Sequence, residues 1–141
     1  MKTKSAQQYS GSCLCGDVSF SVSGFADKIA HCHCSMCRKF HGAAFGTLSP
    51  VKNLTWLSGE SLLTDYVAEN GTTRTFCRQC GSSIGFRCKG EPLERIELAL
   101  NLSEGELPVH IDAHIYTQYK SDWDSITDEL PQFKEGRPSS N

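Results

Sequence analysis

Short runs in which apolar and polar residues alternate recur along the chain. In D-V-S-F-S-V-S, residues 17–23, the apolar residues Val18, Phe20 and Val22 alternate with polar neighbours. Similar runs occur in T-L-S-P-V, L-T-W-L, L-L-T-D-Y-V and I-E-L-A-L, and Gly, Asn or Pro separates them at short intervals. This spacing is typical of short strands joined by turns. The pattern therefore predicts a mainly β fold with antiparallel sheets.

Turns and helices are predicted at a few places only. The Asn-Gly pair at residues 70–71 lies between two strand-like runs and predicts a hairpin. A single helical turn is expected over residues 35–40, with Ser35 as its N-cap. Residues 122–130 predict a short C-terminal helix that ends before Pro131.

The composition fits one domain of modest size. The chain has 141 residues, of which 38% are hydrophobic, and single domains commonly contain about 100–150 residues. We expect a single domain over residues 1–141, with its core at about residues 10–133 and a loose C-terminal tail, E-G-R-P-S-S-N.

Charge and hydropathy argue against several classes of partner. The formal net charge is −2, with acidic and basic residues mixed along the chain, so the clustered positive charge of a nucleic-acid or anionic-membrane binder is missing. The first residues, M-K-T-K-S-A-Q-Q-Y, lack the apolar stretch of a secretory signal. No stretch reaches the roughly 18 consecutive apolar residues that a membrane helix needs. We therefore expect a cytoplasmic protein without nucleic-acid or membrane partners.

Eight cysteines in such a chain are expected to bind metal or to serve redox chemistry, because the cytosol keeps thiols reduced. Four of them form Cys13-x-Cys15-Gly and Cys77-x-x-Cys80-Gly. The glycine allows backbone N–H groups to turn toward the thiolates, and an extended Cys-x-Cys places both side chains on one face. Four sulfurs would close a structural zinc site. The alternative is two ordinary buried cysteines and a redox pair, although the strand-then-helix context of a thioredoxin-like motif is missing around the second motif.

A second group of possible ligands is concentrated in H-C-H-C-S-M-C, residues 31–37. If this segment is extended, Cys32 and Cys34 share one face and the two histidines point to the other. Cys37 then adds a third sulfur from the following turn. Three protein ligands and an exchangeable position are typical of catalytic zinc. Spacing alone leaves open a closed site that is completed by Cys88, His41 or His33.

The cysteine motifs and their surroundings resemble one known family. The strings are G-S-C-L-C-G-D-V-S-F-S-V, C-H-C-S-M-C-R-K-F-H-G-A-A-F, R-T-F-C-R-Q-C-G-S-S-I, P-V-H-I-D-A-H-I-Y and W-D-S-I-T-D-E-L-P-Q-F. In this order, and over nearly the whole chain, they are similar to the glutathione-dependent formaldehyde-activating enzyme family, whose domain is also found in centromere protein V. The resemblance implies an Mss4-like fold, in which small antiparallel sheets and short helical turns are organised around zinc.

The resemblance also implies two zinc ions per chain. A structural zinc would be bound by Cys13, Cys15, Cys77 and Cys80, and a catalytic zinc with an open position by Cys32, Cys34 and Cys37. The implied reaction joins formaldehyde to the thiol of glutathione and gives S-(hydroxymethyl)glutathione, so the protein would be a carbon–sulfur lyase. Three thiolates make zinc a weak Lewis acid but leave it suited to a soft thiol ligand, which coordination would deprotonate. A small thiol is the expected partner.

Several residues near the motifs are candidates for roles in this reaction. Arg38, Lys39 and Arg74 are candidates to meet the two carboxylates of glutathione. His41 or His33 is a candidate to pass a proton to the developing alkoxide. With the three cysteines of the second group, Arg38 and His41 make up the expected catalytic set.

Other residues are expected to stand outside the chemistry. His114 and Trp123 are expected to pack and to form hydrogen bonds, and Cys88 to belong to neither zinc site. Asn101 stands near a position where relatives usually have an aspartate. A non-enzymatic, zinc-stabilised protein-binding module is the alternative function, and thiol or metal sensing a third. The lack of a long charged extension favours the enzyme.

Overall fold

The computed structural model describes residues 7–138 and divides the chain into two compact units. The first unit comprises Met1–Ala26 and Ser49–Pro108, and the second comprises Asp27–Leu48 and Val109–Asn141. That the chain acts as a single domain stays a prediction. The final residues of the expected loose tail, 139–141, lie outside the described residues.

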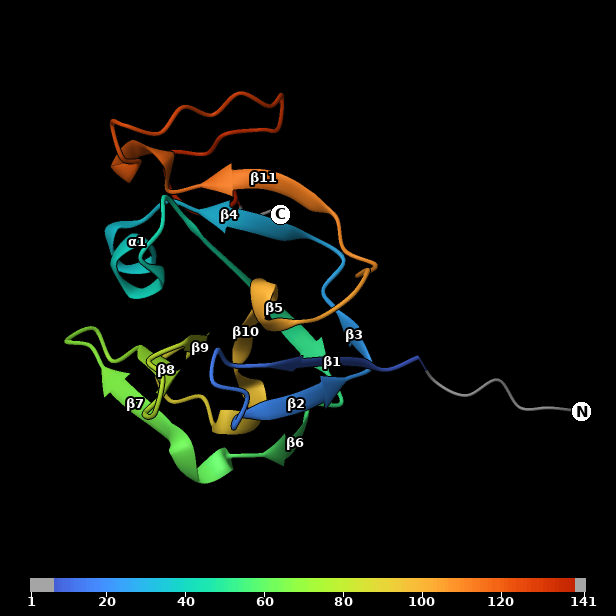
Figure 1. Cartoon of the computed structure of the whole chain (residues 1–141). Coiled ribbons are helices and arrows are strands. Elements are labelled where there is room, and N and C mark those ends of the chain that lie inside the picture. Colours follow the sequence, from blue (N-terminus) through green and yellow to red (C-terminus); the bar gives the residue numbers. More distant parts are fainter. Residues whose placement is uncertain (1–6, 139–141) are drawn as a thin grey trace, which may run out of the picture. The chain divides into compact units, whose positions relative to one another are not determined.

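Strands dominate the described part of the chain, as the alternating pattern predicts (Figure 1). The elements in chain order are β1 (Tyr9–Ser12), β2 (Ser19–Val22), β3 (Gly24–Phe25), β4 (Ile29–Cys32), α1 (Ser35–His41), β5 (Gly46–Lys52), β6 (Thr55–Ser58), η1 (Glu60–Leu62), β7 (Leu63–Val67), β8 (Thr73–Cys77), β9 (Ser83–Arg87), η2 (Leu93–Arg95), β10 (Glu97–Ala99), η3 (Leu100–Leu102), β11 (Ile111–Ile115) and η4 (Thr117–Tyr119).

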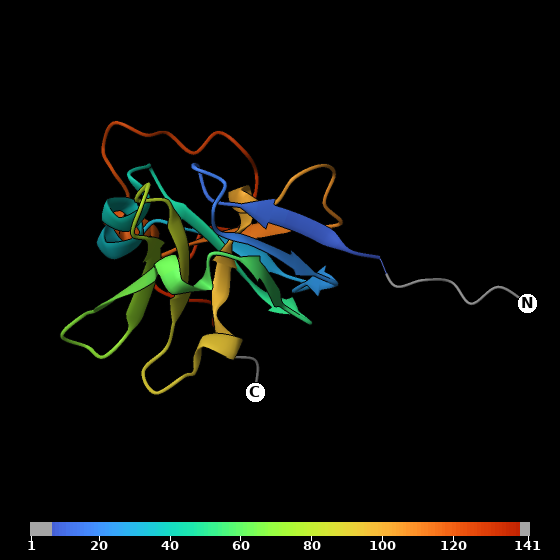
Figure 2. The same cartoon turned by 60° about the horizontal axis from the view of Figure 1, so that its bottom comes forward.

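Antiparallel pairs build the first unit. β2 lies between β1 and β6, and β3 pairs with the end of β5. β7, β8, β9 and β10 follow one another side by side, each antiparallel to the next (Figure 2). The turn between β7 and β8 contains Gly71 with a φ of 89°, a backbone conformation that favours glycine. The hairpin predicted at residues 70–71 is confirmed.

The alternating run around β2 supplies the core of the first unit. Val18, Phe20 and Val22 are each 0% exposed, and the Phe20 ring meets the edge of the Trp56 ring, with 6.0 Å between their centroids. Gly11 of β1 pairs with Phe20, and a Cβ at Gly11 would lie 2.5 Å from the Phe20 ring. The close approach of β1 to this core therefore requires glycine at that position.

The alternation expected in I-E-L-A-L is wrong. Leu98 and Ala99 are neighbours in β10, yet both are buried, and Leu100 already belongs to the 3₁₀ helix η3. Consecutive apolar residues, such as Leu98 and Ala99, are typical of a strand that is buried on both faces. Period-two alternation therefore misreads a strand whose two faces are both covered.

β4 is the central strand of the second unit. β11 runs parallel to it, with His114 opposite His31 and Ile115 opposite Cys32. The first residues of β5 run antiparallel to β4, with Gly46 opposite Cys32. The sequence predicted antiparallel sheets, and the parallel β4–β11 pair is an exception that joins segments far apart in the chain.

The helix α1 begins one residue earlier than the predicted cap at Ser35 implies. The N-cap is Cys34, whose backbone is extended (φ −63°, ψ 153°) and whose Sγ accepts a hydrogen bond from the Cys37 N–H. Ser35 is the first helical residue, so its prediction as the N-cap is wrong. Gly42, with a φ of 62°, ends the helix in the left-handed conformation that favours glycine.

The C-terminal helix predicted over residues 122–130 does not form, since the segment has turns and irregular structure. Its Asp128 carboxylate accepts hydrogen bonds from the His114 ring on β11 and from the Leu130 N–H. A short isolated helix is marginal in water, so these contacts decide the conformation. The described part of the expected tail also has partners, because Arg137 forms an ion pair with Asp112 of β11.

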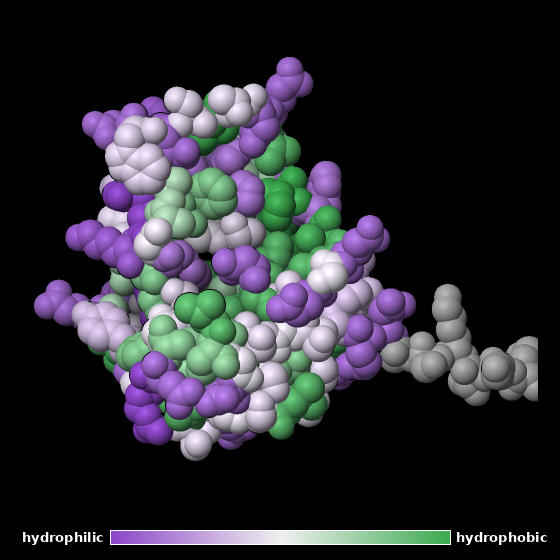
Figure 3. All heavy atoms as spheres, viewed as in Figure 1, coloured by the Kyte–Doolittle hydropathy of each residue, from purple (hydrophilic) through white to green (hydrophobic). Residues whose placement is uncertain are grey.

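Both units carry hydrophobic side chains on their surfaces. On the face shown in Figure 3, hydrophilic residues are spread among hydrophobic ones. Trp123 is 72% exposed, so the expectation that it packs is wrong. The large hydrophobic residues that are exposed are Leu14, Leu57, Tyr66, Val67, Tyr119 and Trp123. Within residues 7–138, every helix is too short or too polar to cross a membrane.

Candidate functional site: two cysteine clusters

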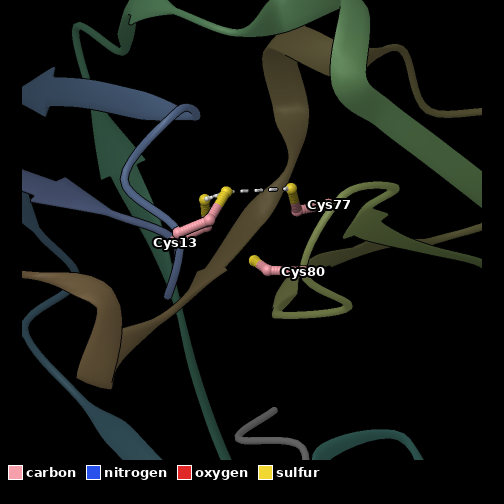
Figure 4. A group of neighbouring side chains, drawn as sticks. Cys13, Cys77 and Cys80 are labelled. Carbon is pink, nitrogen blue, oxygen red and sulfur yellow. Dashed lines mark hydrogen bonds between the residues drawn. The ribbon is translucent and has the colours of Figure 1, made fainter.

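The first unit brings four cysteines into one group, which we call the four-sulfur cluster: Cys13, Cys15, Cys77 and Cys80. The segment after β1 carries Cys13 and Cys15, Cys77 ends β8, and Cys80 lies in the turn before β9, with the sulfurs pointing toward one another (Figure 4). All four sulfurs lie within 4.8 Å of one another, and two of the separations are 3.5 and 4.0 Å. Sulfurs around a tetrahedral zinc, with Zn–S bonds of about 2.3 Å, are about 3.8 Å apart. The donor set therefore fits zinc.

Each motif of this cluster folds into a turn that its glycine closes. The Gly16 N–H donates to the Cys13 carbonyl, and the Gly81 N–H donates to the Cys77 carbonyl, at 3.1 and 2.7 Å. Both glycines have a left-handed φ, 84° and 80°. The expected extended Cys-x-Cys is therefore wrong, because the segment turns at this point. The glycine N–H groups close the turns, and the Val18 N–H reaches the Cys13 sulfur, at 3.4 Å.

Neighbouring groups give the thiols of this cluster unequal acidities. A hydrogen bond from the Ser82 hydroxyl lowers the pKa of Cys80 to about 5. That hydroxyl oxygen accepts from the Leu14 N–H at 2.8 Å, which leaves its own proton for the Cys80 sulfur at 3.3 Å. The Asp17 backbone N–H lowers the pKa of Cys15, but burial and the Cys13 and Cys80 sulfurs raise it to about 11. Crowded thiols resist ionising together, and a divalent cation supplies the charge that stabilises four thiolates.

The second unit brings three cysteines together, which we call the three-sulfur cluster: Cys32, Cys34 and Cys37. Cys32 ends β4, Cys34 caps α1 and Cys37 lies in the first turn of that helix. The three sulfurs lie within 4.8 Å of one another, and among the described residues no histidine, aspartate or glutamate belongs to the group. Hydrogen bonds with the Cys34 and Cys37 sulfurs, followed by burial, raise the pKa of the Cys32 thiol. A cation is thus needed to hold three thiolates here as well.

The two histidines of the H-C-H-C run contribute no ligand atom to the three-sulfur cluster, as the alternation predicted. The His31 and His33 rings contact Phe45, at centroid distances of 4.1 and 5.1 Å, and both contact His114. Burial, with the nearby His114, lowers the pKa of His31 to about 4. His31 is therefore neutral near pH 7, and its Nδ1 hydrogen-bonds to the Thr47 hydroxyl at 2.7 Å.

Three further residues predicted for the site, Arg38, Lys39 and His41, lie on α1. The His41 ring lies against the backbone of Gly46, since a Cβ at Gly46 would come within 2.3 Å of its Cδ2 atom and 3.2 Å of the Cys37 Cβ. His41 therefore lies beside a member of the three-sulfur cluster, and no larger residue fits at position 46 without a shift.

The remaining predicted residues belong to the first unit. Arg74 is buried in β8 and its guanidinium lies over the Phe86 ring, 4.9 Å from the centroid. Its role as a substrate contact stays a prediction. Cys88 is exposed and belongs to neither cluster, as expected. Asn101 is an exposed residue of η3.

Two residues of the second unit that interact with the three-sulfur cluster or with His114 were not predicted from the sequence. Tyr116 follows β11 with a φ of 55°, which is strained for a non-glycine residue. Burial, followed by the charges of Cys32 and other neighbours, raises its pKa. Asp128 hydrogen-bonds to His114, whose expected hydrogen-bonding role is confirmed. Neither residue has a local sequence signal, because a positive φ and a contact between distant segments arise only in the folded chain.

Two cysteine clusters on small β-sheets define a cysteine-rich β protein with two candidate metal centres. Residues 8–119 match the family described as glutathione-dependent formaldehyde-activating enzyme. The chain belongs to this family, and the resemblance noted from its motifs is confirmed.

Two relatives extend this comparison. An uncharacterized lyase of Schizosaccharomyces pombe is 27% identical over 79 residues, which cover 56% of this chain and 57% of that protein. The match thus spans little more than half the length of that relative. The crystal structure of a Rhodobacter sphaeroides protein is similar with a TM-score of 0.53 and 31% sequence identity, and the match covers 70% of this chain and 91% of that chain.

Proposed function

We propose that the chain is a zinc-dependent carbon–sulfur lyase that forms or breaks adducts between a small thiol, such as glutathione, and formaldehyde or a related carbonyl. Family membership and the relative named as a lyase support this proposal. The observation that carries it is the three-sulfur cluster, a group of three soft ligands that includes no fourth ligand from the described residues. A tetrahedral ion bound there has one position for an external ligand.

The reaction requires a thiolate beside a carbonyl carbon. The sulfur attacks that carbon, the C–S bond forms as the C=O double bond becomes single, and the proton that the thiol loses ends on the oxygen. Atoms and electrons balance, so the reaction consumes no oxidant or reductant. A zinc ion bound by three thiolates would lower the pKa of the incoming thiol and favour its thiolate.

The helix that carries the cluster supplies the remaining groups of the proposal. Arg38 and Lys39 lie on α1 with Cys37, and we assign them to the carboxylates of a glutathione-like thiol. Arg74 remains a further candidate for this contact. His41, whose ring lies beside Cys37, is assigned to the transfer of the proton to the developing alkoxide.

The four-sulfur cluster completes the proposal as a structural zinc site, which makes two zinc ions per chain. With it we propose the Mss4-like organisation of small sheets around zinc. All eight cysteines are free thiols, which suits the reducing cytoplasm. We therefore propose a cytoplasmic enzyme whose partner is a small thiol and which has no nucleic-acid or membrane partner.

The proposal is tested by zinc content and adduct formation in the wild type and in Cys34→Ser. Serine keeps the N-cap of α1, because its hydroxyl can accept from the Cys37 N–H, but it removes a soft ligand. We expect two zinc ions per chain in the wild type and one in Cys34→Ser, with the fold retained. Exchange NMR of glutathione and formaldehyde should show catalysed adduct formation by the wild type and none by the variant.

Cys88→Ser is the matched control, since Cys88 is exposed and belongs to neither cluster. It should keep two zinc ions and the wild-type rate. Adduct formation by the wild type at the spontaneous rate would contradict the enzyme and favour the zinc-stabilised binding module.

A further inference from the structure

Three ionisable side chains of the second unit form a continuous hydrogen-bonded chain. His114 Nε2 lies 2.9 Å from Asp128 Oδ2, and His114 Nδ1 lies 2.9 Å from His33 Nε2. His33 is 0% exposed and His114 is 3% exposed, whereas the Asp128 side chain is 46% exposed. The chain thus runs from the surface to a buried imidazole that lies between Cys32 and Cys34 in the sequence.

The acceptor at one end fixes the direction of both hydrogen bonds. An ionised carboxylate can only accept, so the proton between Asp128 and His114 belongs to Nε2 of His114. In the neutral ring Nδ1 of His114 is then an acceptor, and His33 donates to it from Nε2. The hydrogen bond from His114 holds the pKa of Asp128 below its usual range, which keeps this acceptor ionised.

The backbone ties the same residues to the three-sulfur cluster. The His33 N–H donates to the Ile115 carbonyl of β11 at 3.0 Å, and Ile115 pairs with Cys32. His33 is therefore held through both its backbone and its ring, and it is bonded directly to the two cysteines that open the cluster.

The C-terminal segment is bound to the backbone of His114 by two hydrogen bonds and to its ring by Asp128. The His114 N–H donates to the Pro131 carbonyl, and the Phe133 N–H donates to the His114 carbonyl, each at 2.9 Å. Asp128 itself is fixed by the Leu130 N–H, at 3.0 Å. The segment thus holds the carboxylate against the His114 ring.

We propose that Asp128 and His114 are positioning residues of the three-sulfur cluster, which act through His33 to set the orientation of Cys32 and Cys34 and thereby the retention of metal. This inference rests on the proposed function, in which that cluster binds a metal ion. Groups that orient metal ligands through hydrogen bonds commonly change metal affinity by about 10–100-fold when they are removed.

The test uses cobalt-substituted protein and follows metal release to a chelator. Cys34→Ser first identifies which of the two cobalt ions belongs to the three-sulfur cluster. In Asp128→Ala that ion should be released about 10–100-fold faster, and its ligand-field spectrum should change. The other ion should be released at the wild-type rate.

Two further variants separate positioning from general stability. Asp128→Asn still offers an oxygen to His114 Nε2, so it should restore most of the wild-type spectrum and retention. Asp112→Ala removes the ion pair with Arg137 in the same unit without touching the histidines. It should lower the melting temperature and leave metal release unchanged.

The possible failures are distinguishable. If Asp128→Ala releases both ions at wild-type rates with an unchanged spectrum, the positioning role is wrong and the proposed function stands. If Asp112→Ala accelerates release as much as Asp128→Ala does, the effect is one of general stability and the positioning role is again wrong. A wild type that takes up only one metal ion would overturn the metal-binding basis of the proposed function, and this inference with it.

Discussion

The two cysteine clusters differ in the number of sulfurs and in what surrounds them. The four-sulfur cluster lies in two glycine-closed turns, and hydrogen bonds from the Val18 N–H, the Gln79 side chain and the Ser82 hydroxyl reach its sulfurs. The three-sulfur cluster lies at the end of a strand and the start of a helix, and the rings of the neighbouring His31 and His33 contact His114. The first arrangement can enclose an ion, whereas the second leaves one tetrahedral position to another molecule.

The largest expected effect is the loss of a sulfur from the four-sulfur cluster. Cys77 is 0% exposed and ends β8. Structural zinc contributes about 10–16 kcal/mol of binding free energy in small domains, which is comparable with the whole stability of a typical protein. Cys77→Ser should therefore show no cooperative unfolding transition by circular dichroism, whereas Cys34→Ser in the other cluster should keep one. Equal stability of the two variants would contradict the division into structural and open sites.

Gly46→Ala should damage the three-sulfur cluster through sterics alone. The new methyl group would meet the His41 ring at 2.3 Å and the Cys37 Cβ at 3.2 Å, and overpacking of this kind costs about 1–3 kcal/mol. We expect lower stability in urea unfolding and faster release of one metal ion. Gly24→Ala is the control, because its methyl group would meet only the flexible Lys52 side chain, at 3.3 Å. If Gly46→Ala retains metal as well as the wild type does, His41 and Cys37 are not held against the backbone at position 46.

The pH dependence of stability should reflect His31. Its pKa is lowered from 6.5 to about 4 in the folded chain, so between these values the unfolded chain binds a proton that the folded chain does not. The free energy of unfolding therefore falls as the pH decreases through this window. With allowance for the partial exposure of the ring, the loss should be about 1–2 kcal/mol.

His31→Gln should remove this part of the pH dependence, since a neutral side chain does not titrate. His110→Gln should leave it unchanged because His110 is exposed. Urea unfolding at several pH values between 7 and 4 is the measurement. If the wild type and His31→Gln lose stability equally over this range, the half-buried, neutral state of His31 is refuted.

The smallest expected effect concerns a single hydrogen bond at the four-sulfur cluster. Ser82→Ala removes the hydroxyl that lowers the pKa of Cys80, and such a bond is worth about 1 kcal/mol. Metal release from this cluster should become several-fold faster, with the three-sulfur cluster unaffected. Ser23→Ala, which removes hydrogen bonds to the Lys52 carbonyl and the Asn53 amide but contacts neither cluster, should change neither rate. A change at the three-sulfur cluster instead would contradict the assignment of Ser82.

Local patterns predicted what depends on local chemistry. Alternation predicted a strand around Val18, Phe20 and Val22, and the structure places β2 there and buries all three side chains. Cysteine spacing, together with the family resemblance, identified both clusters. The rule that alternate residues of an extended segment point to opposite sides placed His31 and His33 away from the sulfurs.

The cap of the helix and the contacts between distant segments were missed. The N-cap of α1 is Cys34 and not Ser35, because the Cys34 sulfur accepts from the Cys37 N–H. The C-terminal helix was predicted from local composition, yet Asp128 and its neighbours bind β11 instead. Nothing in the sequence near Asp128 indicates that its partner is His114.

The most direct test of the account is the spectrum of the two-cobalt protein during titration with glutathione. The account predicts that glutathione adds a thiolate ligand to the ion of the three-sulfur cluster, with a stronger sulfur-to-cobalt charge-transfer band, and leaves the ion of the four-sulfur cluster unchanged. Cys34→Ser should lose this response. An unchanged wild-type spectrum at saturating glutathione, or an equal response of both ions, would contradict the claim that one cluster is closed and the other open.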